Sequence, residues 1–198
     1  MNKERRSESS LKVGILALQG AVIEHIRMIR QCGCEAMEVK SVQDLDMVDR
    51  LIIPGGESTA IGKLARIYKI DKAIEEKGKK GMPIFGTCAG MILLARKINH
   101  SQKNWFNLIN ITVERNAFGR QVDSFEADLR IKGIQGKPFS AIFIRAPYIK
   151  EAGNDVEILA EFENKIVMVR QKNILVSSFH PELSNDLRIH NYFLSDKF

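Results

Sequence analysis

The first half of the chain alternates apolar, strand-like runs with segments of helical periodicity, and this alternation restricts the possible folds more than any other feature. KVGILAL (12–18) is an almost continuous apolar run, as expected for a strand buried on both faces. Gly20 follows it, and AVIEHIRMIRQCG (21–33) then has helical spacing. Because strands and helices keep alternating, the sequence predicts a parallel sheet covered by helices on both faces.

Further elements follow from the same periodicities. Ser58 or Thr59 is expected to cap the helix that follows the third strand. The predicted strands of the first half are 35–40, 50–56 and 82–88, and its remaining helices are 58–81 and 89–98. The second half has strand-like runs at 125–131, 139–146, 156–162, 166–171 and 174–179, and an amphipathic helix at 185–196. We therefore predict a three-layer α/β fold around an open, mixed and mostly parallel sheet, with antiparallel additions late in the chain.

Composition limits the class of protein. The chain has 198 residues, 44% hydrophobic and 27% charged, which suits one globular domain at 11–198. MNKERRSESS (1–10) has no apolar region, so it is expected to be a disordered tail or an expression remnant, not a secretory signal. Three cysteines, an odd number, argue against a disulfide framework and for the cytoplasm. No run approaches the roughly 18 apolar residues of a membrane span.

The net charge of +6 raises the question of nucleic-acid binding. The basic residues are scattered, and the densest cluster, EEKGKKG (75–81), reads as a solvated helix end. We therefore expect no nucleic-acid partner. Cys32 and Cys34 have no second Cys/His pair at zinc spacing, so no metal site is expected either.

The motif Gly86-x-Cys88-x-Gly90 lies between a predicted strand and a predicted helix. It has the form of a nucleophile elbow with cysteine in place of serine, a sharp turn that holds the nucleophile in a strained conformation. The glycines flank it because side chains would clash there, and the helix N-terminus favours a thiolate. A plain turn around a small buried thiol remains the alternative on this motif alone.

A thiolate nucleophile needs a general base, and histidine fits this role best near neutral pH. Of the four histidines, His25 and His190 fall in amphipathic helices, where they are expected at the surface or its boundary, and His100 lies in a polar loop. His180 ends a predicted strand, and Glu182 follows two residues later, on the same side of an extended chain. These positions predict Cys88 as nucleophile, His180 as acid/base and Glu182 as the group that orients it.

Acyl transfer also needs hydrogen-bond donors for an oxyanion. Elbow geometry assigns one to the N–H of Ala89, and the flexible PGGES segment would supply the second through Gly56. The loops LQGA, PGGEST and GTCAG each follow a predicted parallel strand. Such loops should lie side by side, since open sheets bind ligands at the carboxyl ends of their strands.

Together, PGGEST, GTCAG and FHPE resemble the class I, triad-type glutamine amidotransferases. LALQGAVIEH, PGGESTAIGKL, GTCAGMILLA, VERNAFGRQVDSFE, FIRAP and SSFHPEL look more specifically like the glutaminase subunits of pyridoxal 5′-phosphate synthases, over residues 13–193. This resemblance implies a flavodoxin-like core. It also implies hydrolysis of L-glutamine through a thioester, with the ammonia delivered to a lyase subunit that makes pyridoxal 5′-phosphate, vitamin B6.

The resemblance implies site residues that spacing alone does not. Gln19, in the LQG motif, would lie near the oxyanion loop and the partner interface. An arginine could meet the α-carboxylate of glutamine. The implied substrate-binding residues are Gly56, Glu57, Ser58, Arg115, Ile144 and Arg145.

The family also implies an assembly. Twelve lyase and twelve glutaminase subunits would form the complex, and this chain would bind no cofactor, since pyridoxal 5′-phosphate is the product made on the partner. Two stretches depart from the family: the tail before Leu11 is extra, and Trp105 and Phe106 stand where relatives have a small, Gly-rich stretch. The resemblance therefore does not describe the loop that carries Trp105 and Phe106, nor the partner contacts of that loop.

Three alternatives stay open. The chain could be the glutaminase subunit of another amidotransferase, such as that of histidine biosynthesis, although VERNAFGRQVDSFE speaks against it. It could be a non-catalytic regulatory subunit on the same fold, although the complete set of Cys88, His180 and Glu182 argues against that. A stress-type cysteine hydrolase on a related fold is the third, and it would lack the HPE motif.

Overall fold

A computed structural model describes residues 11–115, 124–195 and 198 of the chain. The predicted tail at 1–10 lies outside the described residues. So does the part of VERNAFGRQVDSFE that spans 116–123. Among the described helices, none has the length and apolar character needed to cross a membrane.

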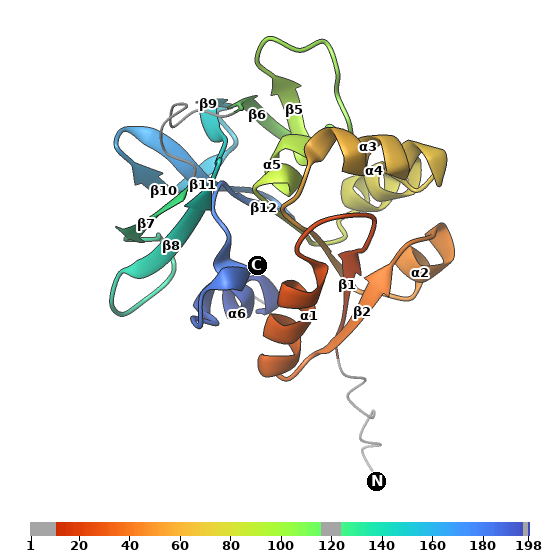
Figure 1. Cartoon of the computed structure of the whole chain (residues 1–198), viewed down its shortest axis with the longest axis horizontal. Coiled ribbons are helices and arrows are strands. Elements are labelled where there is room, and N and C mark those ends of the chain that lie inside the picture. Colours follow the sequence, from red (N-terminus) through yellow and green to blue (C-terminus); the bar gives the residue numbers. More distant parts are fainter. Residues whose placement is uncertain (1–10, 116–123, 196–197) are drawn as a thin grey trace, which may run out of the picture.

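Within the described residues, one mixed sheet of ten strands forms the centre of the molecule. Its strands are β1 (Lys12–Leu16), β2 (Glu35–Val39), β3 (Arg50–Ile53), β4 (Ile84–Thr87), β5 (Ala95–Ile98), β6 (Ile109–Glu114), β9 (Tyr148–Ala152), β10 (Glu157–Phe162), β11 (Lys165–Gln171) and β12 (Ile174–Ser177). They run in the order β2-β1-β3-β4-β12-β11-β9-β6-β5, with β10 paired to β11 (Figure 1). Strands β2, β1, β3, β4 and β12 are parallel, and the antiparallel pairings involve β9, β10 and β11. The predicted mixed α/β sheet is confirmed.

Helices cover both faces of the parallel part of the sheet (Figure 1). They are α1 (Val22–Gln31), α2 (Val42–Asp46), α3 (Ser58–Ile67), α4 (Asp71–Lys79), α5 (Ala89–Leu94) and α6 (Arg188–Leu194), with a short 3-10 helix η1 (Pro181–Leu183). One face packs against α2 to α5, and the other against α1, α6 and the two-stranded sheet of β7 (Ser124–Leu129) and β8 (Phe139–Ile144). The three-layer prediction is therefore confirmed.

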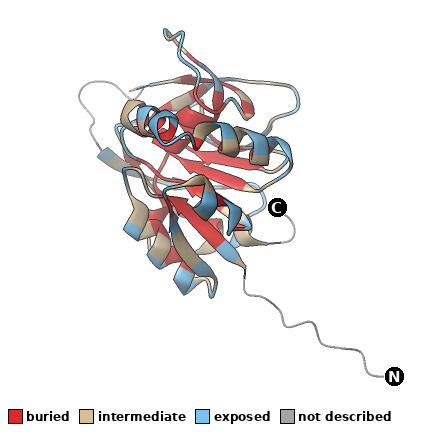
Figure 2. Cartoon of the chain, turned by 90° about the vertical axis from the view of Figure 1, so that its right-hand side faces the viewer, coloured by how far each residue is buried: buried red, intermediate tan, exposed pale blue. Residues whose placement is uncertain are grey.

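The apolar strands explain why two layers of helices are needed. In β3, Leu51 and Ile53 join the hydrophobic cluster under α2 to α5, whereas Ile52 joins the cluster under α1 and α6. All three side chains are fully buried. Figure 2 shows the consequence: the central strands are buried, and the exposed residues lie on the outer surfaces of the helices.

Two predicted helices are wrong in extent. Residues 58–81 form two helices, since α3 ends at Ile67 and α4 begins at Asp71, and Lys69 between them has a positive φ of 57°. Buried residues four positions apart occur on both sides of the break, at Ile61 and Ala65 and again at Ile70 and Ile74. Ala65 and Ile70 are five positions apart, and this one extra residue is too small a signal to separate two helices by periodicity. The predicted helix at 89–98 ends at Leu94, and Ala95–Ile98 forms β5 instead, because it pairs with β6.

Some elements had no counterpart in the sequence prediction. Helix α2 is a single capped turn, in which Ser41 and Asp44 form a capping box. Strands β6 and β9 were also missed. Both pair at the far side of the sheet, where β6 joins β5 in parallel and β9 in antiparallel, so their strand character depends on distant partners.

The segment that departs from the family is packed into the core. Trp105 is 8% exposed and Phe106 is fully buried. The Trp105 ring lies against Gly62 of α3, where a Cβ atom would come within 2.2 Å of it, and the Arg66 guanidinium stacks 4.6 Å from its centroid. These contacts attach the segment to α3, whose N-terminus borders the candidate site.

Candidate active site

Cys88 occupies a strained turn between β4 and α5. Its backbone angles are φ 49° and ψ −101°, a region that residues other than glycine rarely adopt. A Cβ atom on Gly86 would lie 2.7 Å from the carbonyl carbon of Gly90, and one on Gly90 would lie 2.1 Å from the carbonyl oxygen of Ile53. Both glycines are therefore needed for the close approach of backbones, as expected for a nucleophile elbow.

Gly90→Ala is expected to lower both stability and activity, because the added methyl would push α5 away from β3. The cost of such overpacking is typically about 1–3 kcal/mol. Chemical denaturation and the hydrolysis assay described below measure the two effects. Gly33→Ala is the matched control, since nothing lies within 4 Å of its Cβ position. Its φ of 82° strains an alanine, so this change should lower stability without lowering activity. If Gly90→Ala behaved like the wild type, the elbow could not pack against Ile53 as described.

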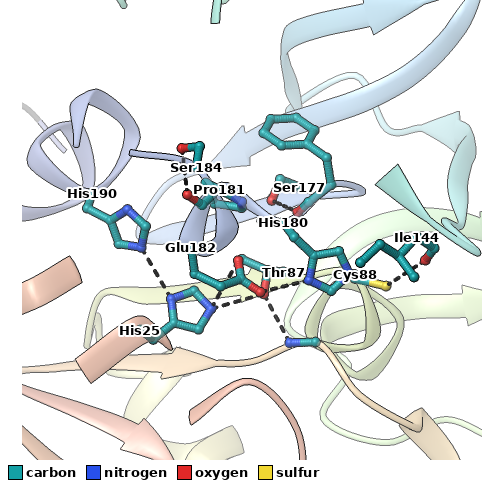
Figure 3. A network of polar contacts seen from close by, with 12 residues as sticks. His25, Thr87, Cys88, Ile144, Ser177, His180, Pro181, Glu182, Ser184 and His190 are labelled. Carbon is teal, nitrogen blue, oxygen red and sulfur yellow. Dashed lines mark hydrogen bonds and ion pairs between the residues drawn. The ribbon is translucent and has the colours of Figure 1, made fainter. Parts of the chain in front are cut away.

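His180 reaches the elbow because β12 is parallel to β4 and the next residues continue past its carboxyl end. The backbone N–H of His180 donates to the carbonyl of Ile142 in β8 at 2.8 Å, which fixes its place. Its Nδ1 lies 2.7 Å from Oε1 of Glu182, and its ring points toward the Cys88 sulfur (Figure 3). The three residues that the sequence predicted are thus brought together in the predicted order.

The electrostatics of this group favour a charged imidazole. Burial alone lowers the pKa of His180, but its hydrogen bonds to Cys88 and Glu182 and their negative charges outweigh burial and raise it to about 10. Burial would also raise the pKa of Glu182, yet His25 and the bond from His180 lower it below its usual value. The arrangement therefore stabilises an imidazolium on His180, held between the Cys88 sulfur and an ionised carboxylate.

The three loops at the carboxyl ends of β1, β3 and β4 meet, as predicted. The N–H of Ala21 donates to the carbonyl of Gly55 at 3.0 Å, and the N–H of Gly55 donates to the Thr87 hydroxyl at 3.0 Å. Gly55 also lies between the two catalytic groups, since a Cβ atom there would be 2.3 Å from Cε1 of His180 and 3.4 Å from Cβ of Cys88. Only a glycine fits at this crossing.

Gln19 lies against the predicted oxyanion loop, as the resemblance implied. Its Oε1 accepts a hydrogen bond from the N–H of Glu57 at 2.7 Å, and it would be 2.5 Å from a Cβ atom on Gly56. The side chain therefore holds the loop from the side of β1. Gly56 and Ala89 both line the cavity described next, and their role as oxyanion donors stays a prediction.

A cavity of about 750 Å³ opens in front of Cys88. Its walls contain every residue that was predicted to bind substrate or oxyanion, together with Gln19, Cys88 and His180; Glu182 lies behind the histidine, fully buried. Arg115 and Arg145 are exposed at the cavity. Sequence reasoning missed the lining residues Ile92, Asn99, His100, Glu114 and Pro147. The segment that carries Asn99 and His100 could not be placed from the sequence, because the predicted helix before it extended to Ile98 whereas α5 ends at Leu94.

Glu57 has a structural role that the sequence prediction gave to its neighbours. Its carboxylate accepts hydrogen bonds from the N–H groups of Thr59 and Ala60 at 2.9 and 2.7 Å, so Glu57 caps α3. The expectation that Ser58 or Thr59 is the N-cap is wrong by one or two residues. Because Glu57 also lines the cavity, α3 begins at the cavity wall.

His25 and His190 are not at the surface, and that expectation is wrong. Both are fully buried. Nδ1 of His25 lies 3.2 Å from Nε2 of His190, and Nε2 of His25 lies 3.4 Å from Oε2 of Glu182 and 3.2 Å from Oγ1 of Thr87 (Figure 3). The triad thus continues behind Glu182 into a polar network between α1 and α6. Within the described residues, no cluster of His, Cys, Asp and Glu side chains is arranged to hold a metal ion.

The site combines a strained cysteine with an imidazole that a carboxylate orients, and a Gly-rich loop lies beside them at the carboxyl ends of the parallel strands. This combination defines a triad-type cysteine amidase. Residues 15–197 match the SNO glutamine amidotransferase family. The chain therefore belongs to this family.

Individual relatives agree with that assignment. Pyridoxal 5′-phosphate synthase subunit PdxT of Pelotomaculum thermopropionicum is 55% identical over 93% of this chain and 94% of its own length. PdxT of Clostridium beijerinckii is 50% identical over 95% and 99%. A crystal structure of a glutamine amidotransferase superposes with a TM-score of 0.87 at 47% identity, over 92% of this chain and 96% of that one. A putative GMP synthase subunit from Thermoplasma acidophilum, at a TM-score of 0.69 and 16% identity over 93% and 92%, shares the fold.

Proposed function

We infer that this chain is the glutaminase subunit of a pyridoxal 5′-phosphate synthase, which hydrolyses L-glutamine to glutamate and ammonia in vitamin B6 biosynthesis. The observation that carries the chemistry is the alignment of Cys88, His180 and Glu182 at the wall of an open cavity. The relatives named above carry the assignment to this synthase, since they match over nearly their whole length.

The reaction begins with the Cys88 thiolate, whose electron pair forms a C–S bond to the side-chain carbonyl carbon of glutamine. The C=O π electrons move to oxygen, giving a tetrahedral oxyanion. When the oxyanion collapses, the C–N bond breaks, and the His180 imidazolium gives its proton to the nitrogen, which leaves as ammonia. A γ-glutamyl thioester remains on Cys88. Neutral His180 then takes a proton from water, the hydroxide adds to the thioester, and the C–S bond breaks to release glutamate.

The N–H groups of Ala89 and Gly56 are proposed to stabilise both oxyanions. They belong to the two loops that flank the sulfur, and both residues line the cavity. Losing one such donor typically costs about 2.7–4 kcal/mol of transition-state stabilisation. The contact of Gln19 with this loop gives a partner subunit a means of setting the orientation of the donors.

The far end of the cavity is proposed to bind the amino-acid part of glutamine. Arg115 and Arg145 place positive charge at its rim, where an α-carboxylate would be paired. Arg145 has a positive φ of 40°, next to Ile144 in the same wall, so this part of the chain is held in a strained conformation facing the substrate. Gly56, Glu57 and Ser58 complete the wall on the other side.

The relatives are subunits of a synthase, so the chain is proposed to work with a partner. We propose that this partner is the lyase subunit, in a cytoplasmic complex of twelve and twelve, and that this chain binds no cofactor of its own. Ammonia would pass directly into the lyase subunit. Enclosure suits the chemistry, because free ammonia in water is protonated and ceases to be a nucleophile.

The test is ammonia release from glutamine by the purified chain, with and without the lyase subunit. Low activity alone and a clear rise with the partner are expected, because docking would set the N–H groups of the oxyanion loop. Gln19→Ala is expected to reduce the rise in activity, since the N–H of Glu57 in the oxyanion loop loses its acceptor. A readout of glutamine-dependent pyridoxal 5′-phosphate formation in the same mixture identifies the synthase. No ammonia release in either condition would contradict the glutaminase assignment.

A further inference from the structure

Glu182 has two carboxylate oxygens, and the triad uses one of them. Oε1 accepts the hydrogen bond from Nδ1 of His180 at 2.7 Å. Oε2 is buried, and it makes no hydrogen bond of good geometry within the described part of the chain. The group that faces it is Nε2 of His25, at 3.4 Å. Because Glu182 is fully buried, an unpartnered carboxylate oxygen here would be costly, and His25 is the donor placed to satisfy it.

The neighbours of His25 determine which nitrogen carries its proton. Burial lowers the pKa of His25 below its usual value and the pKa of His190 to about 3, so both rings are neutral near physiological pH and each has one N–H. A proton on Nε2 of His25 points at a carboxylate, whereas a lone pair there would repel it. With that proton on Nε2, Nδ1 of His25 accepts from Nε2–H of His190 at 3.2 Å.

The remaining nitrogen supports the same assignment. Nδ1 of His190 is buried without a hydrogen-bond partner in the described residues. If His190 donates through Nε2, this atom is an unprotonated acceptor, and no buried N–H is left unpaired. The opposite arrangement would leave a buried N–H of His190 without a partner and a lone pair of His25 against Glu182. The polar groups therefore form a directed chain from His190 through His25 to Glu182, His180 and Cys88.

We propose that His25 is a positioning residue of the catalytic triad, whose neutral Nε2–H holds the outer carboxylate oxygen of Glu182 and so fixes the carboxylate that orients His180. The same nitrogen lies 3.2 Å from the Thr87 hydroxyl, which accepts from the N–H of Gly55. Through Thr87, His25 therefore connects the triad to Gly55 in the loop that also carries Gly56. The proposal rests on the glutaminase function inferred above.

His25 comes from α1, and this gives the helix a role beyond covering the sheet (Figure 3). The loop that leads into α1 carries Gln19, which holds the N–H of Glu57. One short segment, 19–25, thus contacts the oxyanion loop at its start and the triad carboxylate at its end. A displacement of α1 would change both contacts together.

The groups that determine the titration of this network come from every element around it. Glu182 is faced by His180 from its own segment and by His25 from α1. The other ionisable groups acting on the network are Glu24, next to His25 on α1, His190 from α6, and Cys88 from the elbow. Removing the N–H of His25 withdraws one of the donors that stabilise the charged form of Glu182. Its carboxylate should then accept a proton at a higher pH.

The experiment uses the full chain with its lyase partner and compares His25→Leu, His25→Gln and Ile29→Ala. Leucine removes the N–H, whereas glutamine keeps an N–H within reach of Glu182. Ile29 is a fully buried residue of the same helix with no polar role, so Ile29→Ala controls for lost stability. For each variant, kcat and KM for glutamine are measured across pH, and Tm is measured alongside.

For His25→Leu, kcat is expected to fall about 10–100-fold, the range seen when outer-shell partners of metal sites are removed, with KM unchanged. The acid limb of the kcat profile is expected to move up by roughly one pH unit. His25→Gln should have most of the wild-type kcat, and its acid limb should lie close to that of the wild type. Ile29→Ala should lower Tm without moving the limb. An unshifted limb in His25→Leu, or no recovery with glutamine, would overturn the proposal.

A second measurement needs no variant. In the 15N spectrum of histidine-labelled wild-type protein, the His25 signals are expected to show the neutral Nε2–H tautomer throughout the pH range of activity. The Nδ1–H tautomer would overturn the proposal even if His25→Leu failed to fold. Wild-type protein without glutaminase activity would instead contradict the proposed function, and the tautomer would still be determined.

Discussion

Replacing Cys88 with alanine is expected to abolish glutamine hydrolysis and leave the fold intact. In triad enzymes, loss of the nucleophile costs on the order of 10⁶ in kcat. The fold should survive because alanine keeps the Cβ atom and removes only a sulfur that lies on the cavity wall. The backbone strain at φ 49° is the same for alanine and cysteine.

The measurement is ammonia release by Cys88→Ala in the presence of the lyase subunit, with circular dichroism and Tm as tests of folding. Cys32→Ala is the matched control, since it also removes one thiol. Burial, with a smaller contribution from Cys34, raises the pKa of Cys32 to about 11, so that thiol stays protonated near neutral pH. Full activity in Cys88→Ala would disprove the nucleophile assignment, and loss of activity in Cys32→Ala would show that thiol removal is harmful in general.

Glu182→Gln is expected to lower kcat by about 10⁴-fold, as the equivalent change does in serine proteases, without unfolding the chain. Glutamine keeps the size of the side chain but removes the negative charge beside His180. Because this charge and its hydrogen bond help to raise the pKa of His180 to about 10, their loss lowers that pKa toward its ordinary value. The imidazolium that protonates the leaving ammonia is then absent at a pH where the wild type still has it.

The pH dependence gives this prediction its sign. In the wild type, hydrolysis should decline only as the pH rises through about 10, where His180 loses its proton. In Glu182→Gln, the alkaline decline should begin roughly 1–3 pH units lower. Rates measured between pH 6 and pH 10.5 decide between the two, with Glu161→Gln, an exposed carboxylate, as the control. An unchanged alkaline limb would mean that Glu182 does not support the charge on His180.

The triad could be predicted from the sequence because its signals are local. Two glycines around Cys88 reveal the turn without any knowledge of what it packs against, and Glu182 follows His180 closely enough to share its orientation. The structure adds the reason for the glycines, since the space that their side chains would fill is taken by the backbone of Ile53 and by the elbow itself.

The buried histidine pair could not be predicted in this way. The periodicity of α1 shows which residues face inward, but a histidine at the edge of that face is ordinarily assigned to the surface. Whether His25 is solvated or buried depends on Glu182 and His190, which reach it from the opposite end of the chain. Such a contact leaves no periodic signal at either position.

Helix boundaries failed for a related reason. The residues after Leu94 keep a buried pair, Ala95 and Ile98, at the i, i+3 spacing of one helix face, whereas two strand residues at this spacing point to opposite faces of a sheet. The choice between the two was decided by β6, whose backbone groups pair with this segment. The error displaced the segment that carries Asn99 and His100, and so two residues of the cavity wall were missed.

By itself, the sequence determined the alternation of strands β1 to β4 with helices, the strained turn at Cys88 and the His180–Glu182 pair, because each depends on residues close together in the chain. Only the tertiary structure decided which loops share the cavity, where the strand pairings end, and that His25 lies behind Glu182. The physical reason is that burial of a charge requires partners from several elements at once. Those partners become neighbours only when β4, β12, α1 and α6 have packed together.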